Sequence, residues 1–141
     1  MTHVFIADDE THTRIGLTFI LESIGYIVTG AANGREALDK ILALRESSHP
    51  VDLLVLDIEM PGLTGWQLLG VLKEKNIIVP TIIITGFSDN RTGGKVFKEW
   101  SVEYIVKPFT PEVLIESISN VLEKKRPREG DTREDGYQMQ R

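Results

Sequence analysis

The stretch VDLLVLD, residues Val51 to Asp57, decides the fold class of this 141-residue chain. After Asp52 it is continuously apolar until it reaches the carboxylate of Asp57. A strand with one face in water alternates apolar and polar residues, whereas a strand covered on both faces is apolar throughout. The stretch is therefore predicted to be a central strand of a parallel sheet that delivers Asp57 at its carboxyl end.

Three other apolar runs end at polar side chains. They are His3–Ala7 before Asp8 and Asp9, Thr81–Ile84 before Thr85, and Val102–Val106 before Lys107. A fifth run, Tyr26–Ala32, is half polar and is predicted to be an edge strand. Ligands of open α/β sheets bind outside the carboxyl ends of the strands, so these polar side chains are expected to line one cleft.

Helical patterns separate the runs. They cover Ile15–Ile24, Ala37–Leu44, Trp66–Leu72, Ser88–Trp100 and a last helix that reaches Leu122. Gly25 ends the first helix, and a turn or N-cap at Asn33-Gly34 precedes the second. Thr110-Pro111-Glu112 is the predicted start of the last helix. The fourth is expected to be short or mobile, because Gly93-Gly94 costs roughly 1 kcal/mol per glycine in a helix. Alternating strands and helices predict an α/β fold, a doubly wound five-stranded parallel sheet with helices on both faces.

The charge divides the chain into two parts. Residues 1–123 carry 17 Asp/Glu and 10 Lys/Arg, a net charge of −7, and are predicted to form one domain. Residues 124–141 carry 6 Lys/Arg and 4 Asp/Glu, a net charge of +2, with few apolar residues, and are predicted to be a disordered charged tail or linker. The acidic domain argues against nucleic-acid binding, because phosphate contacts supply most of that affinity.

The location of the protein is suggested by what the sequence omits. It has no cysteine, hence no thiolate metal site, which fits a reducing compartment. Its first residues lack the basic region of a signal peptide, and no apolar stretch reaches the roughly 18 residues of a membrane span. We expect a cytoplasmic domain without membrane contact.

The acidic residues at the strand ends point to a cation. Taken alone, the acidic run Asp8-Asp9-Glu10 would be interpreted as a solvated turn that caps a helix. Asp57 changes this reading, since a carboxylate at the end of a buried strand is costly without compensation. Oxygen ligands with few carboxylates suit Mg²⁺. The sequence therefore predicts a magnesium site.

Asp57 is then the candidate nucleophile for a phosphoryl group. The Thr85 hydroxyl is placed to donate to a phosphoryl oxygen, and Gly86 leaves room for the group. Lys107 would balance the acids and contact phosphate, with Pro108 imposing an extended or turn conformation or a cis bond. Each residue alone has a common structural explanation, but together they predict one phosphoryl-accepting site.

Four motifs in order resemble the receiver domain of a two-component response regulator, similar to the stand-alone chemotaxis receiver. They are Ala-Asp-Asp-Glu from residue 7, Leu-Asp-Ile-Glu-Met-Pro-Gly from 56, Ile-Ile-Ile-Thr-Gly from 82 and Tyr-Ile-Val-Lys-Pro-Phe from 104. Each motif is weak alone, but all four in order are specific, and the resemblance covers roughly residues 3–123. It implies a flavodoxin-like sheet with strand order 2-1-3-4-5.

The resemblance also implies roles for single residues. Mg²⁺ would be held by Asp9, Asp57 and the backbone carbonyl of Glu59, with Asp8 assisting. Asp57 would accept a phosphoryl group from the phosphohistidine of a sensor histidine kinase or phosphotransfer protein. Such a domain is a signalling switch rather than an enzyme, and it promotes only its own phosphorylation and dephosphorylation.

The implied switch connects the site to an output surface. Thr85 and Lys107 would hold the phosphoryl oxygens, and Tyr104 falls on the switch aromatic that turns inward as Thr85 moves. Phosphorylation would then shift the face formed by the predicted helix at 88–100, the strand at 102–106 and the last helix. The expected partner is a downstream effector or an absent output domain, and a phosphorylation-linked dimer is a further expectation. Phe87 is expected to shield the acyl phosphate from water.

Three other readings stay open at this point. A haloacid-dehalogenase-like phosphohydrolase would also use an aspartate nucleophile, but its Asp-x-Asp lies near the first strand, whereas here Glu59 follows Asp57. A flavodoxin-like flavin protein needs a Ser/Thr/Gly-rich phosphate loop where this chain has acids. In the third reading the acids are unused and the domain only dimerises.

Overall fold

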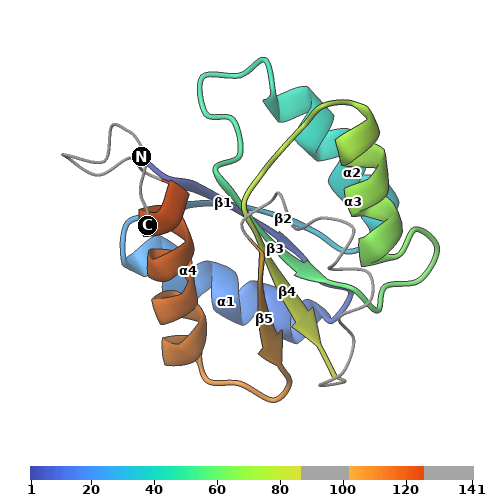
Figure 1. Cartoon of the computed structure of the whole chain (residues 1–141). Helices are drawn as coiled ribbons and strands as arrows, with labels where there is room; N and C mark the ends of the chain where they lie inside the picture. The colour runs from blue at the N-terminus through green and yellow to red at the C-terminus, as the bar shows by residue number, and fades with distance from the viewer. Residues whose placement is uncertain (87–101, 126–141) are drawn as a thin grey trace, which may run out of the picture.

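The computed structural model describes residues 1–86 and 102–125, which form five strands and four helices (Figure 1). The strands are β1 His3–Ala7, β2 Ile27–Ala31, β3 Leu53–Asp57, β4 Thr81–Thr85 and β5 Val102–Val106. The helices are α1 Thr11–Ser23, α2 Gly34–Leu44, α3 Gly65–Glu74 and α4 Pro111–Lys125. The helix predicted at 88–100 and most of the predicted tail lie outside the described residues, although α4 continues to Lys125, two residues past the predicted boundary.

All strand pairs are parallel, and the order is β2-β1-β3-β4-β5, as the resemblance implied. β3 lies in the centre and is buried along its whole length, whereas the half-polar β2 is an edge strand, as predicted. In the β3–β4 register, Asp57 lies opposite Ile84, and in the β4–β5 register Thr85 lies opposite Val106. The register therefore brings the ends of three neighbouring strands to one edge.

Helices cover both faces of the sheet, which confirms the doubly wound architecture. α1 and α4 pack on one face, where Leu17, Leu21 and Leu114 meet the side chains of alternate strand residues such as Ile6 and Val55. α2 and α3 cover the other face, as Figure 1 shows. In the described part of the chain, no helix is both long and apolar enough to cross a membrane.

The predicted helix ends are confirmed by local geometry. Gly25 follows α1 with φ +106°, a conformation that costs glycine little. Asn33 caps α2 by accepting a 2.8 Å hydrogen bond from the Glu36 amide. Thr110 precedes Pro111 at the start of α4, and its hydroxyl accepts a 3.4 Å bond from the Val113 amide.

Helix α1 carries more large apolar residues than the fold buries. Leu17 and Leu21 are buried, but Ile15 is 61% exposed, Phe19 74% and Ile24 51%. Residues 17 and 21 lie one turn apart on one side of the helix, whereas 15 and 19 lie about 200° around it from 17 and 21. A helix that packs on one sheet face buries a single stripe, so Ile15 and Phe19 are left in solvent.

Candidate functional site

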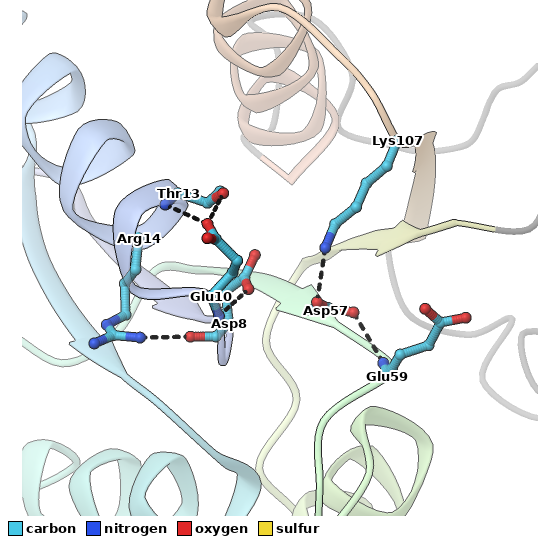
Figure 2. A network of polar contacts seen from close by, with 7 residues as sticks. All are labelled: Asp8, Glu10, Thr13, Arg14, Asp57, Glu59 and Lys107. Carbon is cyan, nitrogen blue, oxygen red and sulfur yellow. Dashed lines mark hydrogen bonds and ion pairs between the residues drawn. The ribbon is translucent and has the colours of Figure 1, made fainter.

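The site lies where β1, β3, β4 and β5 end. β1 leads into Asp8 and Asp9, β3 ends at Asp57, β4 ends at Thr85, and Lys107 follows β5. Figure 2 shows Asp8, Asp57 and Lys107 gathered around the same point, with Glu59 on the loop after β3. The structure thus brings together the strand-end residues that the sequence predicted would meet.

Three carboxylates form the acidic part of the site. One oxygen each from Asp8, Asp9 and Asp57 lies within 4.8 Å of the other two. Asp8 is 1% exposed and Asp57 2%, whereas Asp9 is open to solvent. Carboxylates held this close in a partly dry environment repel one another, and a cation relieves that repulsion.

Asp8 has one satisfied and one unsatisfied oxygen. Its Oδ1 accepts a 2.8 Å hydrogen bond from the Glu10 amide. Its Oδ2 is buried and has no hydrogen-bond partner among the described residues. Burial raises the pKa of Asp8 above its ordinary value, and this outweighs the lowering by the Glu10 hydrogen bond and by Lys107. The unsatisfied oxygen is a candidate cation ligand beside two other acids.

Both oxygens of Asp57 have partners. Oδ1 accepts a 2.9 Å bond from the Glu59 amide, and Oδ2 lies 3.0 Å from Lys107 Nζ. Partial burial lowers the pKa of Lys107, but the hydrogen bond to Asp57 and the charges of Asp8, Asp57 and Asp9 outweigh this and raise the pKa above its ordinary value. Lys107 is therefore a cation at neutral pH, directed at the carboxylate predicted to react.

Backbone contacts hold the strand ends together. The Lys107 amide donates a 2.8 Å hydrogen bond to the Thr85 carbonyl, so the ends of β4 and β5 are joined directly. The Lys107–Pro108 bond is cis, one of the conformations considered from the sequence. Gly65, at the start of α3, lies so close to the residue after Asp57 that an added Cβ would sit 2.6 Å from Ile58 Cα. The loop after Asp57 is thereby pressed against α3.

The remaining predicted residues have different surroundings. Thr85 is 2% exposed at the end of β4. Tyr104 lies on β5 opposite Ile83, is half-buried, and packs against the core on the α2–α3 side of the sheet. The exposed Glu59 reaches toward the end of β4, since its Oε1 would be 3.7 Å from a Cβ added to Gly86. Phe87 lies outside the described residues.

Arg14 was not predicted from the sequence to belong to this region. Its Nη1 donates a 2.7 Å hydrogen bond to the backbone carbonyl of Asp8, as Figure 2 shows. Its side chain also packs on β2, because an added Cβ on Gly30 would lie 3.2 Å from Arg14 Cδ. No sequence signal separates this arginine from one in solvent, since its partner is a main-chain oxygen.

The donor set fits a hard divalent cation. Every candidate ligand is a carboxylate or carbonyl oxygen, three carboxylates converge, and Asp8 Oδ2 lacks any other partner in the described ranges. Oxygen ligands with a small number of carboxylates, together with retained waters, are the usual environment of Mg²⁺. The residues present therefore fit the predicted ion.

Comparison with known sequences places the chain in one family. Residues 4–119 match the model of the response regulator receiver domain. The response regulator RR06 of Streptococcus pneumoniae is 31% identical over 86% of this chain and 54% of its own length. The probable transcriptional regulator ycf27 of Cyanidium caldarium is 35% identical over 89% of this chain and 48% of its own length. The chain thus spans about half the length of these relatives.

Solved structures agree with the sequence comparison. A response regulator receiver domain protein from Clostridium thermocellum superposes with a TM-score of 0.76 and 29% identity, covering 89% of this chain and 97% of that one. The response regulator TrrA of Thermotoga maritima, solved in complex with Mg²⁺-BeF, has a TM-score of 0.70 and 33% identity, covering 86% and 99%. These comparisons do not support the phosphohydrolase and flavin-protein hypotheses. The chain belongs to the response regulator receiver domains, the phosphorylation-dependent signalling domains of two-component systems.

Proposed function

We propose that this domain is a cytoplasmic phosphorylation switch in which Asp57 accepts a phosphoryl group from a phosphohistidine. The donor is a sensor histidine kinase or a phosphotransfer protein. The observation that carries the proposal is the placement of Asp57, whose carboxylate lies beside those of Asp8 and Asp9 and 3.0 Å from the Lys107 ammonium. A nucleophile close to both acidic cation ligands and a fixed ammonium is equipped for phosphoryl transfer.

The transfer exchanges one bond for another. An oxygen of the Asp57 carboxylate forms a bond to phosphorus as the bond between phosphorus and the donor's imidazole nitrogen breaks. The electron pair of that bond stays on the imidazole, which then takes up a proton from water. Lys107 is held to Asp57 before the reaction and is placed to contact an oxygen of the phosphoryl group afterwards.

Mg²⁺ supplies charge neutralisation for the phosphoryl oxygens when it is bound. Asp8, Asp9 and Asp57 would hold it, together with the backbone carbonyl of Glu59. Asp8 has an oxygen available for this, because its Oδ2 has no partner within the described ranges. Glu59 is positioned by the hydrogen bond from its amide to Asp57.

The switch begins at Thr85 and Lys107, which would hold the phosphoryl oxygens. Their direct backbone hydrogen bond supports coupled movement of the β4 and β5 ends. Tyr104, the proposed switch aromatic, lies on β5 and lines a groove of about 530 Å³ with Phe109 and Val113. A shift of Thr85 toward a phosphoryl oxygen would change the packing of Tyr104 and therefore the shape of this groove.

The output surface consists of β5, α4 and the segment predicted as a helix at 88–100. Val106 and Val113 are 42% and 46% exposed on it, so it offers apolar contacts. A downstream effector or an output domain would bind there, and dimerisation after phosphorylation would use the same face. Because the acyl phosphate would carry about −1.5 to −2 units of charge at pH 7 in place of the single charge of the Asp57 carboxylate, and would add strong acceptor oxygens, the equilibrium between two arrangements of this face would shift.

The donor protein has a place to bind beside Asp57. A mostly apolar groove of about 470 Å³ lies between α1 and the start of α4, lined in part by His12, Leu17, Lys107 and Phe109. Because Lys107 belongs both to this groove and to the Asp57 ion pair, a helix bound in the groove would lie next to the reacting carboxylate.

The test is the intact mass of the protein after incubation with acetyl phosphate and Mg²⁺. We expect the wild type to gain one phosphoryl group and Asp57→Asn to gain none. Asp39→Asn, which changes an exposed acid on α2, is the matched control and should gain the group as the wild type does. Chelation of Mg²⁺ beforehand should prevent the gain.

Two results would overturn the proposal. A phosphoryl adduct of equal yield on Asp57→Asn would show that another residue is modified. An unmodified wild type that also fails to accept phosphate from a panel of phosphorylated histidine kinases would leave a receiver-like scaffold whose acids are unused.

A further inference from the structure

We propose that the outward face of α1 binds a second copy of this chain in an antiparallel, twofold-symmetric helix pair. This face, which we call the α1 face, consists of Arg14, Ile15, Thr18, Phe19 and Glu22. It is separate from the proposed output surface on β5 and α4, and from the groove proposed for the phosphodonor on the other side of α1. The inference does not depend on phosphorylation.

The α1 face exposes apolar surface that the monomer does not use. Ile15 is 61% exposed and Phe19 74%, one turn apart on the helix. Both line a groove of about 470 Å³ whose far wall is formed by Glu36 and Lys40 of α2. Neighbouring large apolar side chains beside a groove and between charged residues are typical of an interaction site.

The charges of the face complement themselves. Arg14 lies at one end and Glu22 at the other, eight residues or about 12 Å apart along the helix. In an antiparallel pair with its twofold axis near Thr18, each Arg14 faces Glu22 of the second copy. A twofold interface repeats every contact, so one pattern yields two ion pairs.

The centre of the face is suited to a dry helix contact. Thr18 is small, and its hydroxyl already donates a 2.8 Å hydrogen bond to the Arg14 carbonyl, so it carries no unsatisfied donor into the interface. Ile15 and Phe19 then flank the axis from both helices. The bond from Arg14 Nη1 to Asp8 uses one of the five guanidinium N–H donors, which leaves others for a carboxylate.

Pairing through the neighbouring edge strand is disfavoured, which selects the helix pair. The outward-facing groups at the end of β2 are occupied by α2: Lys40 Nζ donates to the Gly30 carbonyl at 2.8 Å, and the Ala32 amide donates to Glu36 at 2.8 Å. Lys40 and Glu36 are themselves paired at 3.0 Å. A charged, hydrogen-bonded edge blocks addition of another strand.

The local charge also permits self-association. Although residues 1–123 carry a net charge of −7, Arg14 and Lys40 balance Glu22 and Glu36 around the groove. Repulsion between the acidic remainders acts at longer range and is screened beyond about 8 Å at physiological ionic strength. A single helix face buries less than a standard interface, so the dimer should be weak.

The experiment is sedimentation velocity of the full chain without Mg²⁺ or phosphodonor, over roughly 10 µM to 1 mM, the range of weak complexes. We expect concentration-dependent dimerisation of the wild type and its loss in Phe19→Asp. Ile78→Asp is the matched control, because Ile78 is 55% exposed outside the α1 face and should not affect association.

Charge exchange tests the twofold arrangement itself. Arg14→Glu and Glu22→Arg should each remain monomeric, whereas an equimolar mixture of the two should form a dimer with both ion pairs restored. Circular dichroism tests whether each variant is folded. If Arg14→Glu does not fold, Glu22→Arg is used alone, because it alters only an exposed residue. In that case Glu22→Arg must still abolish the wild-type dimer.

Three outcomes would overturn the inference. They are a wild type that is monomeric over the whole range, a dimer that persists in Phe19→Asp, and folded charge variants that do not associate when mixed. A monomeric wild type whose Phe19→Asp variant loses phosphotransfer from a histidine kinase would assign the α1 face to that kinase instead of a second copy.

Discussion

Lys107 Nζ lies 3.0 Å from Asp57 Oδ2, although the two residues are 50 positions apart in the chain. The contact exists because β3, β4 and β5 are parallel neighbours whose carboxyl ends lie at one edge. It places a positive charge beside Asp57, whose carboxylate also lies close to those of Asp8 and Asp9. Removing any one of these charges should therefore change the Mg²⁺ affinity or the free energy of unfolding, and both can be measured without an activity assay.

Replacing Lys107 with methionine should strengthen Mg²⁺ binding, because the ammonium repels a cation bound at the acids. We expect about a tenfold gain in affinity by calorimetric titration. In chelator, the same variant should lose about 1–2 kcal/mol of unfolding free energy, less than a fully buried pair would lose, because the Lys107 side chain is 34% exposed. Lys107→Arg keeps the charge and is the control. Weaker Mg²⁺ binding by the methionine variant would contradict this account.

The stability of the metal-free protein should depend on the ionisation of Asp8. Burial raises the pKa of this carboxyl in the folded state above its ordinary value of 3.8, so the folded protein holds the proton more tightly than the unfolded chain. The charged form therefore destabilises the fold at neutral pH, and this cost disappears as the pH falls through the raised pKa toward 3.8. Asp8→Asn should be about 1–3 kcal/mol more stable than wild type at pH 7 and equal to it near pH 4.

Chemical denaturation in chelator at several pH values measures this difference. Asp39→Asn, which alters an exposed acid, should show no comparable gain. A gain for Asp8→Asn that is independent of pH would mean that it does not arise from the carboxylate charge.

Mg²⁺ should stabilise the folded domain, because the three carboxylates converge only after folding. At a concentration 100 times its dissociation constant, a ligand of the native state adds about 2.7 kcal/mol. We expect a corresponding rise in melting temperature for the wild type, reversed by chelator. Without Mg²⁺, Asp9→Asn should have the melting temperature of the wild type, since Asp9 is exposed. With Mg²⁺, its melting temperature should rise much less than that of the wild type.

Exposed Glu46 provides the comparison for that experiment. Glu46→Gln should respond to Mg²⁺ as the wild type does. An equal response from Asp9→Asn would remove Asp9 from the ligand set.

Two glycines of α3 should respond oppositely to alanine. In Gly65→Ala the new Cβ would lie 2.6 Å from Ile58 Cα, so the loop after Asp57 must move, at a cost of about 1–3 kcal/mol. Gly70 has nothing within 4 Å of an added Cβ, and alanine there should stabilise the helix by about 0.5–1 kcal/mol. Unfolding free energies from urea titrations compare the two variants. Equal effects would show that Gly65 is not in close contact with the loop.

The sequence by itself determined the layout of the fold and most of the site. The runs before Asp8, Asp57, Thr85 and Lys107 became strands because continuous apolar character is a local property of a strand buried on both faces. Their polar ends then had to meet at one edge, since all the strands are parallel. Capping at Asn33 and Thr110 was likewise readable, because a cap depends on residues within one helical turn.

Only the tertiary structure decided which of these groups have partners. The pattern of α1 showed apolar residues on several sides, but the single sheet face beneath it buries Leu17 and leaves Phe19 in solvent. The Arg14 side chain bonds to the backbone carbonyl of Asp8, and Gly65 lies close to the backbone of Ile58. Because each partner is a main-chain atom, the residue types give no sign of either contact. Local signals specify where an element begins and what it can bury, whereas contacts between elements depend on how they are packed together.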